Sequence, residues 1–222
     1  MRIISGKWGG RKISAPQGKG TRPTSERMRE SVFSSLHSRI GSFVDLRVLD
    51  VFAGSGALGL EALSRGAHFL ASVDSDPAAC RVIEENFISL AGEVESENDD
   101  NFRLFRLDIF HTTSRLKNLG IDLAFFDPPY EISDNELLQL LGKLSQQKTF
   151  SFGAILVIER QKKSLFADLL AGNEWGFQLL DVKSKGDTAF YYLSFIPSTN
   201  LSEKTLNTES NCSDIGEQEI RE

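Results

Sequence analysis

Short apolar segments alternate along most of this chain with longer segments whose apolar residues recur every three to four positions. The short segments are rich in Val, Ile, Leu and Phe, which favours β-strands at 47–52, 69–74, 102–108, 121–127 and 153–159, with two more flanking 185–187. The helical spacing covers 24–40, 57–66, 76–91, 134–146 and 162–172. Alternating strands and helices predict a mostly parallel sheet with helices on both faces, to which the final hairpin adds an antiparallel strand.

Composition agrees with one large domain. The chain has 222 residues, of which 40% are hydrophobic, enough for a substantial core. No stretch approaches the roughly 20 consecutive apolar residues of a membrane span, so we expect no membrane partner. The two cysteines, Cys80 and Cys212, fit neither a disulfide framework nor a metal site. They favour a reducing cytoplasm, and the three scattered histidines add no metal-ligand spacing.

Charged residues are distributed unevenly along the chain. The net charge is −6, but the first 30 residues hold eight basic residues against two acidic ones, so they carry +6 and the remainder −12. A basic arm can supply the phosphate contacts of a nucleic-acid-binding protein, although a solvated terminus explains the same charges. We expect a basic arm over 1–23, a main domain over 24–197 with an exposed acidic loop at 93–100, and a disordered acidic tail over 198–222.

Glycines follow the first predicted strand in "VLDVFAGSGALGLEAL". Gly54, Gly56 and Gly59 have G-x-G-x-x-G spacing, and Asp74 ends the next strand twenty residues after Gly54. Glycines at such a turn let a ligand lie against bare backbone, and the later carboxylate can accept both hydroxyl groups of a ribose. The pattern suits a dinucleotide as well as S-adenosylmethionine, and a purely structural turn also remains open.

Asp50 distinguishes between these ligands. It lies inside the first strand, four residues before Gly54, where a pyrophosphate would gain nothing from a nearby negative charge. A cationic sulfonium ligand with an amino group would be attracted to it. The alternative is a carboxylate that only bonds to the backbone of the turn.

The strand that ends at "FFDPPY" carries the second motif. Asp127 and the carbonyl of Pro128 form two adjacent acceptors, and Pro129 stiffens the turn. Two acceptors suit an exocyclic amine, because holding both hydrogens directs the nitrogen lone pair at an electrophile. Tyr130 can stack on the ring that carries the amine. A rigid turn with a capping Asp and a packed Tyr is the alternative.

These motifs, together with "RIISGKWGGRKI", "TRPTSERMRESVFSSL", "LDVFAGSGALGLEALSRGA" and "VDSDPAA", resemble the RsmD family over roughly residues 1–196. The resemblance implies an S-adenosylmethionine-dependent methyltransferase acting on N2 of a guanine in 16S ribosomal RNA. It also implies a Rossmann-like α/β fold with a mostly parallel seven-stranded sheet, an antiparallel last strand and a small β-rich N-terminal arm. The expected partner is 16S ribosomal RNA or the small ribosomal subunit, for a monomeric cytoplasmic enzyme. Lys185 departs from the family, where an aromatic residue is common.

The resemblance also assigns roles to residues of this chain. Asp74 would bind the cofactor ribose and Asp108 the adenine amine, and the other expected cofactor-binding residues are Asp50, Phe52, Ala53, Gly54, Ser55, Gly56, Gly59 and Ser75. The catalytic residues would be Asp127, Pro128, Pro129 and Tyr130. The RNA-facing arm would contribute Arg11, Thr21, Arg22, Pro23, Thr24 and Arg27, of which Arg11, Arg22, Thr24 and Arg27 are the expected substrate contacts.

Other classes of protein remain open at this point. A DNA adenine-N6 methyltransferase would use the same tetrapeptide but usually carries a target-recognition insert. A protein glutamine methyltransferase commonly has Asn before the prolines. An NAD-dependent dehydrogenase would need an acid or base that "DPPY" does not supply. A non-catalytic RNA-binding module would have no reason to bind S-adenosylmethionine.

Overall fold

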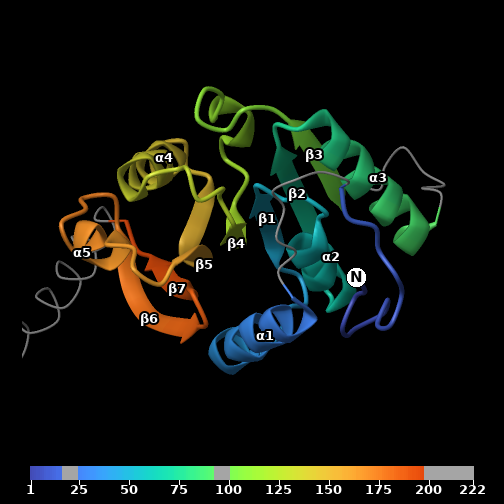
Figure 1. The fold of residues 1–222 in the computed structure, drawn as a ribbon. Helices are drawn as coiled ribbons and strands as arrows, with labels where there is room; N and C mark the ends of the chain where they lie inside the picture. The colour runs from blue at the N-terminus through green and yellow to red at the C-terminus, as the bar shows by residue number, and fades with distance from the viewer. Residues whose placement is uncertain (17–24, 93–100, 198–222) are drawn as a thin grey trace, which may run out of the picture.

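The computed structural model describes residues 1–16, 25–92 and 101–197 (Figure 1). Its α-helices are α1 (Glu26–Ile40), α2 (Ala57–Ser64), α3 (Pro77–Ala91), α4 (Asp134–Gln146) and α5 (Phe166–Ala171), with a 3₁₀-helix η1 at Ser114–Leu116. Its strands are β1 (Arg47–Val51), β2 (Phe69–Asp74), β3 (Phe102–Arg106), β4 (Ile121–Phe126), β5 (Phe150–Gln161), β6 (Phe177–Lys185) and β7 (Thr188–Phe195). The predicted acidic loop and tail, and Thr21, Arg22, Pro23 and Thr24, lie outside the described residues.

The strands form one seven-stranded sheet in the order β3-β2-β1-β4-β5-β7-β6. All neighbouring pairs are parallel except those made by β7, which runs antiparallel to β5 and β6. This confirms the predicted Rossmann-like fold. The strand order reverses between β1 and β4, where Val51 pairs with Phe126. The segments that follow these two strands therefore leave the same edge of the sheet side by side, which is where such sheets bind ligands.

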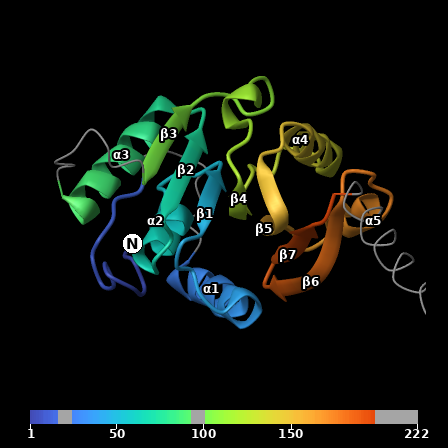
Figure 2. The same cartoon turned by 180° about the vertical axis from the view of Figure 1, so that it is seen from behind.

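Alternating side chains give the sheet two apolar faces. In β1, Val48 belongs to the core beneath α1, α2 and α3, whereas Leu49 and Val51 belong to the core beneath α4 and α5 (Figures 1 and 2). The same alternation in β4 packs the ring of Phe125 against Phe33 of α1, with 5.6 Å between ring centroids. Both faces of the central strands β1 and β4 are thus buried, as expected for parallel strands covered by helices on each side.

Several predicted boundaries differ from the observed ones by one to four residues, and two of these differences have clear local reasons. The first strand ends at Val51 rather than at residue 52, because Phe52 has a φ of 60°, far from the negative φ of extended strand backbone. The last helix begins at Phe166, four residues later than predicted, because the residues after β5 form a turn. The start of α3 is as expected: the Asp76 side chain accepts the amide of Ala78, and Pro77 occupies the first turn.

The N-terminal segment packs against α2 as part of the core. Ile3, Trp8 and Ile13 are buried, and the fully buried carboxylate of Glu61 accepts the amides of Ile4 (2.6 Å) and Ser5 (3.1 Å). The predicted β-rich arm is reduced, within the described residues, to an isolated antiparallel bridge between Arg2 and Lys12. Residues 1–16 therefore belong to the same packed unit as the sheet.

This contact predicts a large loss of stability in Glu61→Ala. Two backbone amides and the guanidinium of Arg65, which lies 2.7 Å from Glu61, would lose their acceptor in a buried place. We expect the free energy of unfolding in urea to fall by about 3 kcal/mol. The control is Glu84→Ala, whose exposed side chain lies on α3, and which should change stability by less than about 0.5 kcal/mol. Equal effects of the two variants would contradict this account of the segment.

Candidate active site

A cavity of about 400 Å³ opens at the carboxyl ends of β1, β2 and β4. Most of the residues that line it come from the glycine turn (52–56), the end of β2, the Asp127–Tyr130 turn and the N-terminal segment, and β1, β5, α1, α2 and α3 add the others. They are Met1, Ala15, Pro16, Arg29, Asp50, Phe52, Ala53, Gly54, Ser55, Ala57, Leu58, Asp74, Ser75, Asp76, Ala79, Asp127, Pro128, Pro129, Tyr130, Glu131 and Glu159. Both predicted motifs thus face one space.

Asp50 forms the buried floor of this cavity. Its side chain is 2% exposed, and its Oδ2 accepts the amide of Gly59 at 3.0 Å. Burial raises the pKa of Asp50 to about 8, with smaller contributions from the negative charges of Asp127 and Asp74, against the lowering effect of the Gly59 hydrogen bond. A cation placed here would favour the ionised carboxylate, so the site suits a positively charged ligand.

The glycine turn leaves bare backbone along the cavity. Gly54 and Gly56 have φ values of 57° and 74°. Residues with a Cβ atom rarely adopt such positive φ values, whereas glycine adopts them readily. The amide of Gly54 donates to Asp74 Oδ2 at 2.8 Å, which joins the turn to the end of β2. Gly59 serves packing instead, because a Cβ there would lie 2.5 Å from a methyl group of Leu70. Gly56 shapes the turn and Gly59 lets α2 pack closely on β2, and neither residue lines the cavity.

The Asp127–Tyr130 turn contributes all four of its residues to the cavity lining. The amide of Asp127 lies 3.4 Å from the carbonyl of Val51, so the turn begins directly beside the end of β1. Pro128 is buried, whereas Pro129 and Tyr130 are exposed, with 47% of the tyrosine accessible. The ring of Tyr130 is therefore available to stack on a planar ligand that enters from solvent.

Besides Gly56 and Gly59, three predicted site residues of the described part of the chain do not line the cavity. Asp108 is exposed outside the cavity lining, and its carboxylate bonds to the ring of His111 (2.8 Å) and the amide of Phe110 (2.9 Å). The hydrogen bond to His111 is the main reason that the pKa of Asp108 is lowered. Arg11 donates to the carbonyls of Ser89 and Leu90 at the end of α3. Arg27 is exposed on α1.

Sequence reasoning missed the part of the wall that Arg29 and Met1 contribute. Arg29 is fully buried and donates to the carbonyl of Arg2 at 2.6 Å. Its Nη1 lies 3.8 Å from the sulfur of Met1, which also receives the hydroxyl of Ser55 at 3.4 Å. The available signal was the helical spacing of Arg29 with Val32, which places the arginine on the buried face of α1.

These residues fit S-adenosylmethionine. Asp50 and Asp74 offer carboxylates for an ammonium group and for ribose hydroxyl groups, and Gly54 offers unobstructed backbone. Within residues 1–16, 25–92 and 101–197, no cluster of three potential metal ligands occurs, and no helix is long and apolar enough to cross a membrane.

The comparisons with known proteins agree with this geometry. The family model described as Conserved hypothetical protein 95 matches residues 1–194. Ribosomal RNA small subunit methyltransferase D of Haemophilus influenzae is 30% identical over 190 residues, covering 86% of this chain and 91% of the relative. The protein of the same name in Buchnera aphidicola is 32% identical over 161 residues, which cover 72% of this chain and 78% of the relative. The solved structure of yhhF from Escherichia coli has 29% identity and a TM-score of 0.68, covering 89% of this chain and 99% of that one. The chain therefore belongs to the RsmD family of S-adenosylmethionine-dependent ribosomal RNA methyltransferases.

Proposed function

We propose that this protein methylates N2 of a guanine in 16S ribosomal RNA at the cavity between β1 and β4. The observation that carries the proposal is the pairing of Val51 with Phe126, since it places the glycine turn and the Asp127–Tyr130 turn at one edge of the sheet. The names of the relatives support a small-subunit ribosomal RNA substrate. Such a substrate also supports action in the cytoplasm, and a cavity lined by one chain is compatible with a monomer.

The cofactor would be held by acceptors that face the cavity. Asp50 would bind the amino group of the methionine moiety, and Asp74 the ribose hydroxyl groups. Asp74 already accepts the amides of Gly54 and Asp76, but each carboxylate oxygen can accept a second hydrogen. Asp108 remains our proposal for the adenine amine, and it would exchange its bond to His111 for the new one.

The Asp127–Tyr130 turn would present the guanine. The Asp127 carboxylate and the Pro128 carbonyl accept the two hydrogens of the N2 amine, while the ring of Tyr130 stacks on the base. When bound, S-adenosylmethionine would supply an electrophilic methyl group, and cleavage of the bond between its sulfur and that methyl group would leave S-adenosylhomocysteine. Asp127 holds the amine so that the nitrogen lone pair points at that group, and the methylated nitrogen then loses one proton to Asp127 or to water. No strong base is needed, because the methylated amine is acidic before it loses the proton.

Transfer of a labelled methyl group tests the proposal. The protein would be incubated with labelled S-adenosylmethionine and, separately, with small ribosomal subunits, protein-free 16S RNA and DNA, followed by nucleoside analysis. We expect N2-methylguanosine in at least one of the RNA substrates. Label in adenine of DNA would instead favour an adenine-N6 methyltransferase. Absence of both transfer and cofactor binding by calorimetry would leave a non-catalytic RNA-binding module.

The proposed RNA contact of Arg27 gives a second prediction. This side chain is exposed on α1, and Arg27 follows Thr24 by three positions in the sequence. Arg27→Ala should weaken binding of small subunits severalfold, because one phosphate contact is lost, and leave cofactor affinity unchanged. Arg11→Ala should act differently and lower thermal stability, since its guanidinium holds the end of α3. Equal losses of RNA and cofactor affinity in Arg27→Ala would contradict the assignment.

A further inference from the structure

A second hollow adjoins the candidate active site. It has a volume of about 690 Å³ and is lined by Tyr130, Gln161, Lys162, Lys163 and Asp187. Tyr130 also lines the cofactor cavity, so its half-exposed ring forms the boundary between the two spaces. A polymer that delivers a base to Tyr130 can therefore continue directly into this hollow.

Lysine side chains give the hollow a net positive charge. Lys162 and Lys163 follow β5 and are exposed, and Lys185 is exposed at the nearby turn between β6 and β7. Asp187 supplies the only carboxylate among the described residues that line the hollow. Of the ion pairs within the described residues, none involves these three lysines. Their ammonium groups are thus available to an anionic partner.

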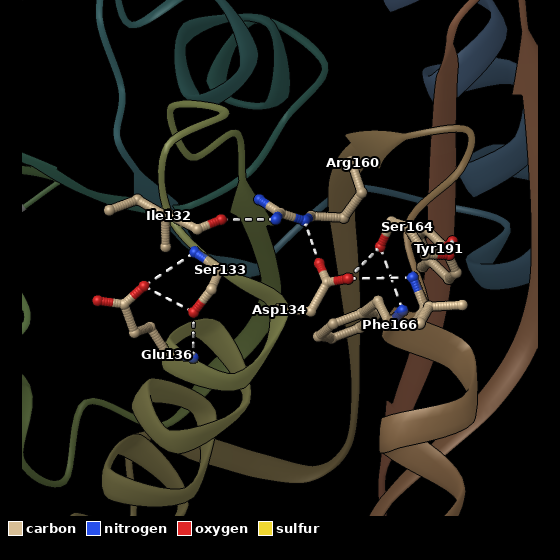
Figure 3. A network of polar contacts seen from close by, with 9 residues as sticks. Ile132, Ser133, Asp134, Glu136, Arg160, Ser164, Phe166 and Tyr191 are labelled. Carbon is tan, nitrogen blue, oxygen red and sulfur yellow. Dashed lines mark hydrogen bonds and ion pairs between the residues drawn. The ribbon is translucent and has the colours of Figure 1, made fainter.

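A partly buried polar network connects the residues after the lysine turn, which carries Lys162 and Lys163, to the residues after the Asp127–Tyr130 turn (Figure 3). Asp134 accepts three hydrogen bonds: from Arg160 Nε at 2.7 Å, Ser164 Oγ at 2.8 Å and the amide of Leu165 at 3.0 Å. Arg160 also donates to the carbonyl of Ile132 at 2.6 Å. Because Ile132 follows the Asp127–Tyr130 turn and Ser164 follows the lysines, the network joins the two turns.

The hairpin of β6 and β7 also holds the backbone of the lysine turn. The amide of Lys162 donates to the carbonyl of Asp187 at 2.8 Å, directly after the pairing of Gln161 with Thr188. The start of α4 is fixed as well, since Ser133 and Glu136 form a capping box that orients the exit from the Asp127–Tyr130 turn (Figure 3). The backbone that carries the two lysines is therefore held in place relative to the Asp127–Tyr130 turn, which lowers the entropic cost of binding one ligand at both turns.

We propose that this hollow binds the ribose-phosphate backbone next to the target guanine, with Lys162 and Lys163 contacting phosphates. The inference rests on the proposed function and adds to it the path of the RNA. An RNA strand is the partner that the geometry favours, because a base held at Tyr130 brings its own phosphates to the adjoining space. Positive charge beside an exposed aromatic ring is also the combination that binds unpaired nucleic acid.

The test compares two variants that each remove two positive charges. Lys162→Ala/Lys163→Ala changes the hollow, whereas Arg115→Ala/Lys117→Ala changes exposed residues on the connection that leads into the amino end of β4. Methyl transfer to unmodified small ribosomal subunits would be measured over a range of salt concentrations. For the lysine variant we expect a KM for subunits raised roughly tenfold, and a slope of log KM against log salt reduced by about 1.4. Its kcat and its affinity for S-adenosylmethionine should stay unchanged.

The control variant should shift KM by less than about twofold, since its charges lie outside the path of the RNA. Lys162→Arg/Lys163→Arg should restore the wild-type KM, because arginine also contacts phosphate. A lysine variant with the KM and salt slope of the control would overturn the inference alone. A fall in kcat or in cofactor affinity at unchanged KM would overturn it too. Lack of transfer by the wild-type protein would remove the proposed function and, with it, the path proposed here.

Discussion

Asp127→Ala is expected to lower methyl transfer to ribosomal RNA by roughly 10³-fold or more, because the amine loses the acceptor that orients its lone pair. The measurement is a single-turnover assay with saturating RNA and cofactor. Cofactor affinity by calorimetry should remain within a few fold, since the proposed role of Asp127 is to hold the guanine and the variant leaves Asp50 and Asp74 of the same cavity intact. Turnover within tenfold of the wild type would rule out the proposed mechanism.

Two further variants distinguish orientation from charge. Asp127→Asn keeps one side-chain oxygen as an acceptor, so we expect transfer between that of the wild type and that of Asp127→Ala. Glu131→Ala removes an exposed carboxylate from the same cavity and should reduce transfer only severalfold. If Glu131→Ala lowered methyl transfer as much as Asp127→Ala, loss of negative charge in the cavity would explain the effect better than loss of the hydrogen bond from the amine to Asp127.

Asp50→Asn is expected to weaken binding of S-adenosylmethionine by roughly 100-fold at pH 8, because the cationic ligand loses its buried anionic partner. In the wild type, affinity should rise with pH and level off above about pH 8, since Asp50, whose pKa burial raises to about 8 in the free protein, must release its proton to pair with the ligand. The pH dependence contributed by Asp50 should be absent in Asp50→Asn. Calorimetry in buffers of different ionisation enthalpy measures the released proton directly.

The same variant should be more stable than the wild type without cofactor. In the unfolded chain the Asp50 carboxyl has its ordinary pKa of 3.8, whereas in the folded protein burial raises the pKa to about 8. The folded state therefore binds the extra proton between these values, and stability is lost as pH rises from about 4 to about 8. We expect the Tm of Asp50→Asn to exceed that of the wild type by about 4 °C or more at pH 8. The difference should vanish near pH 4, and a lower Tm at pH 8 would refute the assignment.

The sequence by itself determined the elements and the edge at which the chemistry would lie. The second strand was predicted at 69–74 and is observed at Phe69–Asp74, because a buried strand in a parallel sheet is a continuous apolar run that local composition reveals. Alternation of such runs with helices predicted the layered fold. The glycine turn and "DPPY" were recognisable because their chemistry depends on neighbours in sequence, and the rule for strand ends placed both on one edge.

Only the tertiary structure decided which distant groups meet. Arg11 binds the carbonyl of Leu90, 79 residues away, and Glu61 binds the amide of Ile4, 57 residues away, so the basic segment is partly a core element. Arg29 became part of the cavity wall for the same reason. Asp134 and Arg160 fix the turn after β5, which is why α5 begins late. The periodicity of apolar residues shows which face of its own helix or strand each side chain occupies. The partners of a buried polar group are set by packing between elements, and no local pattern encodes them.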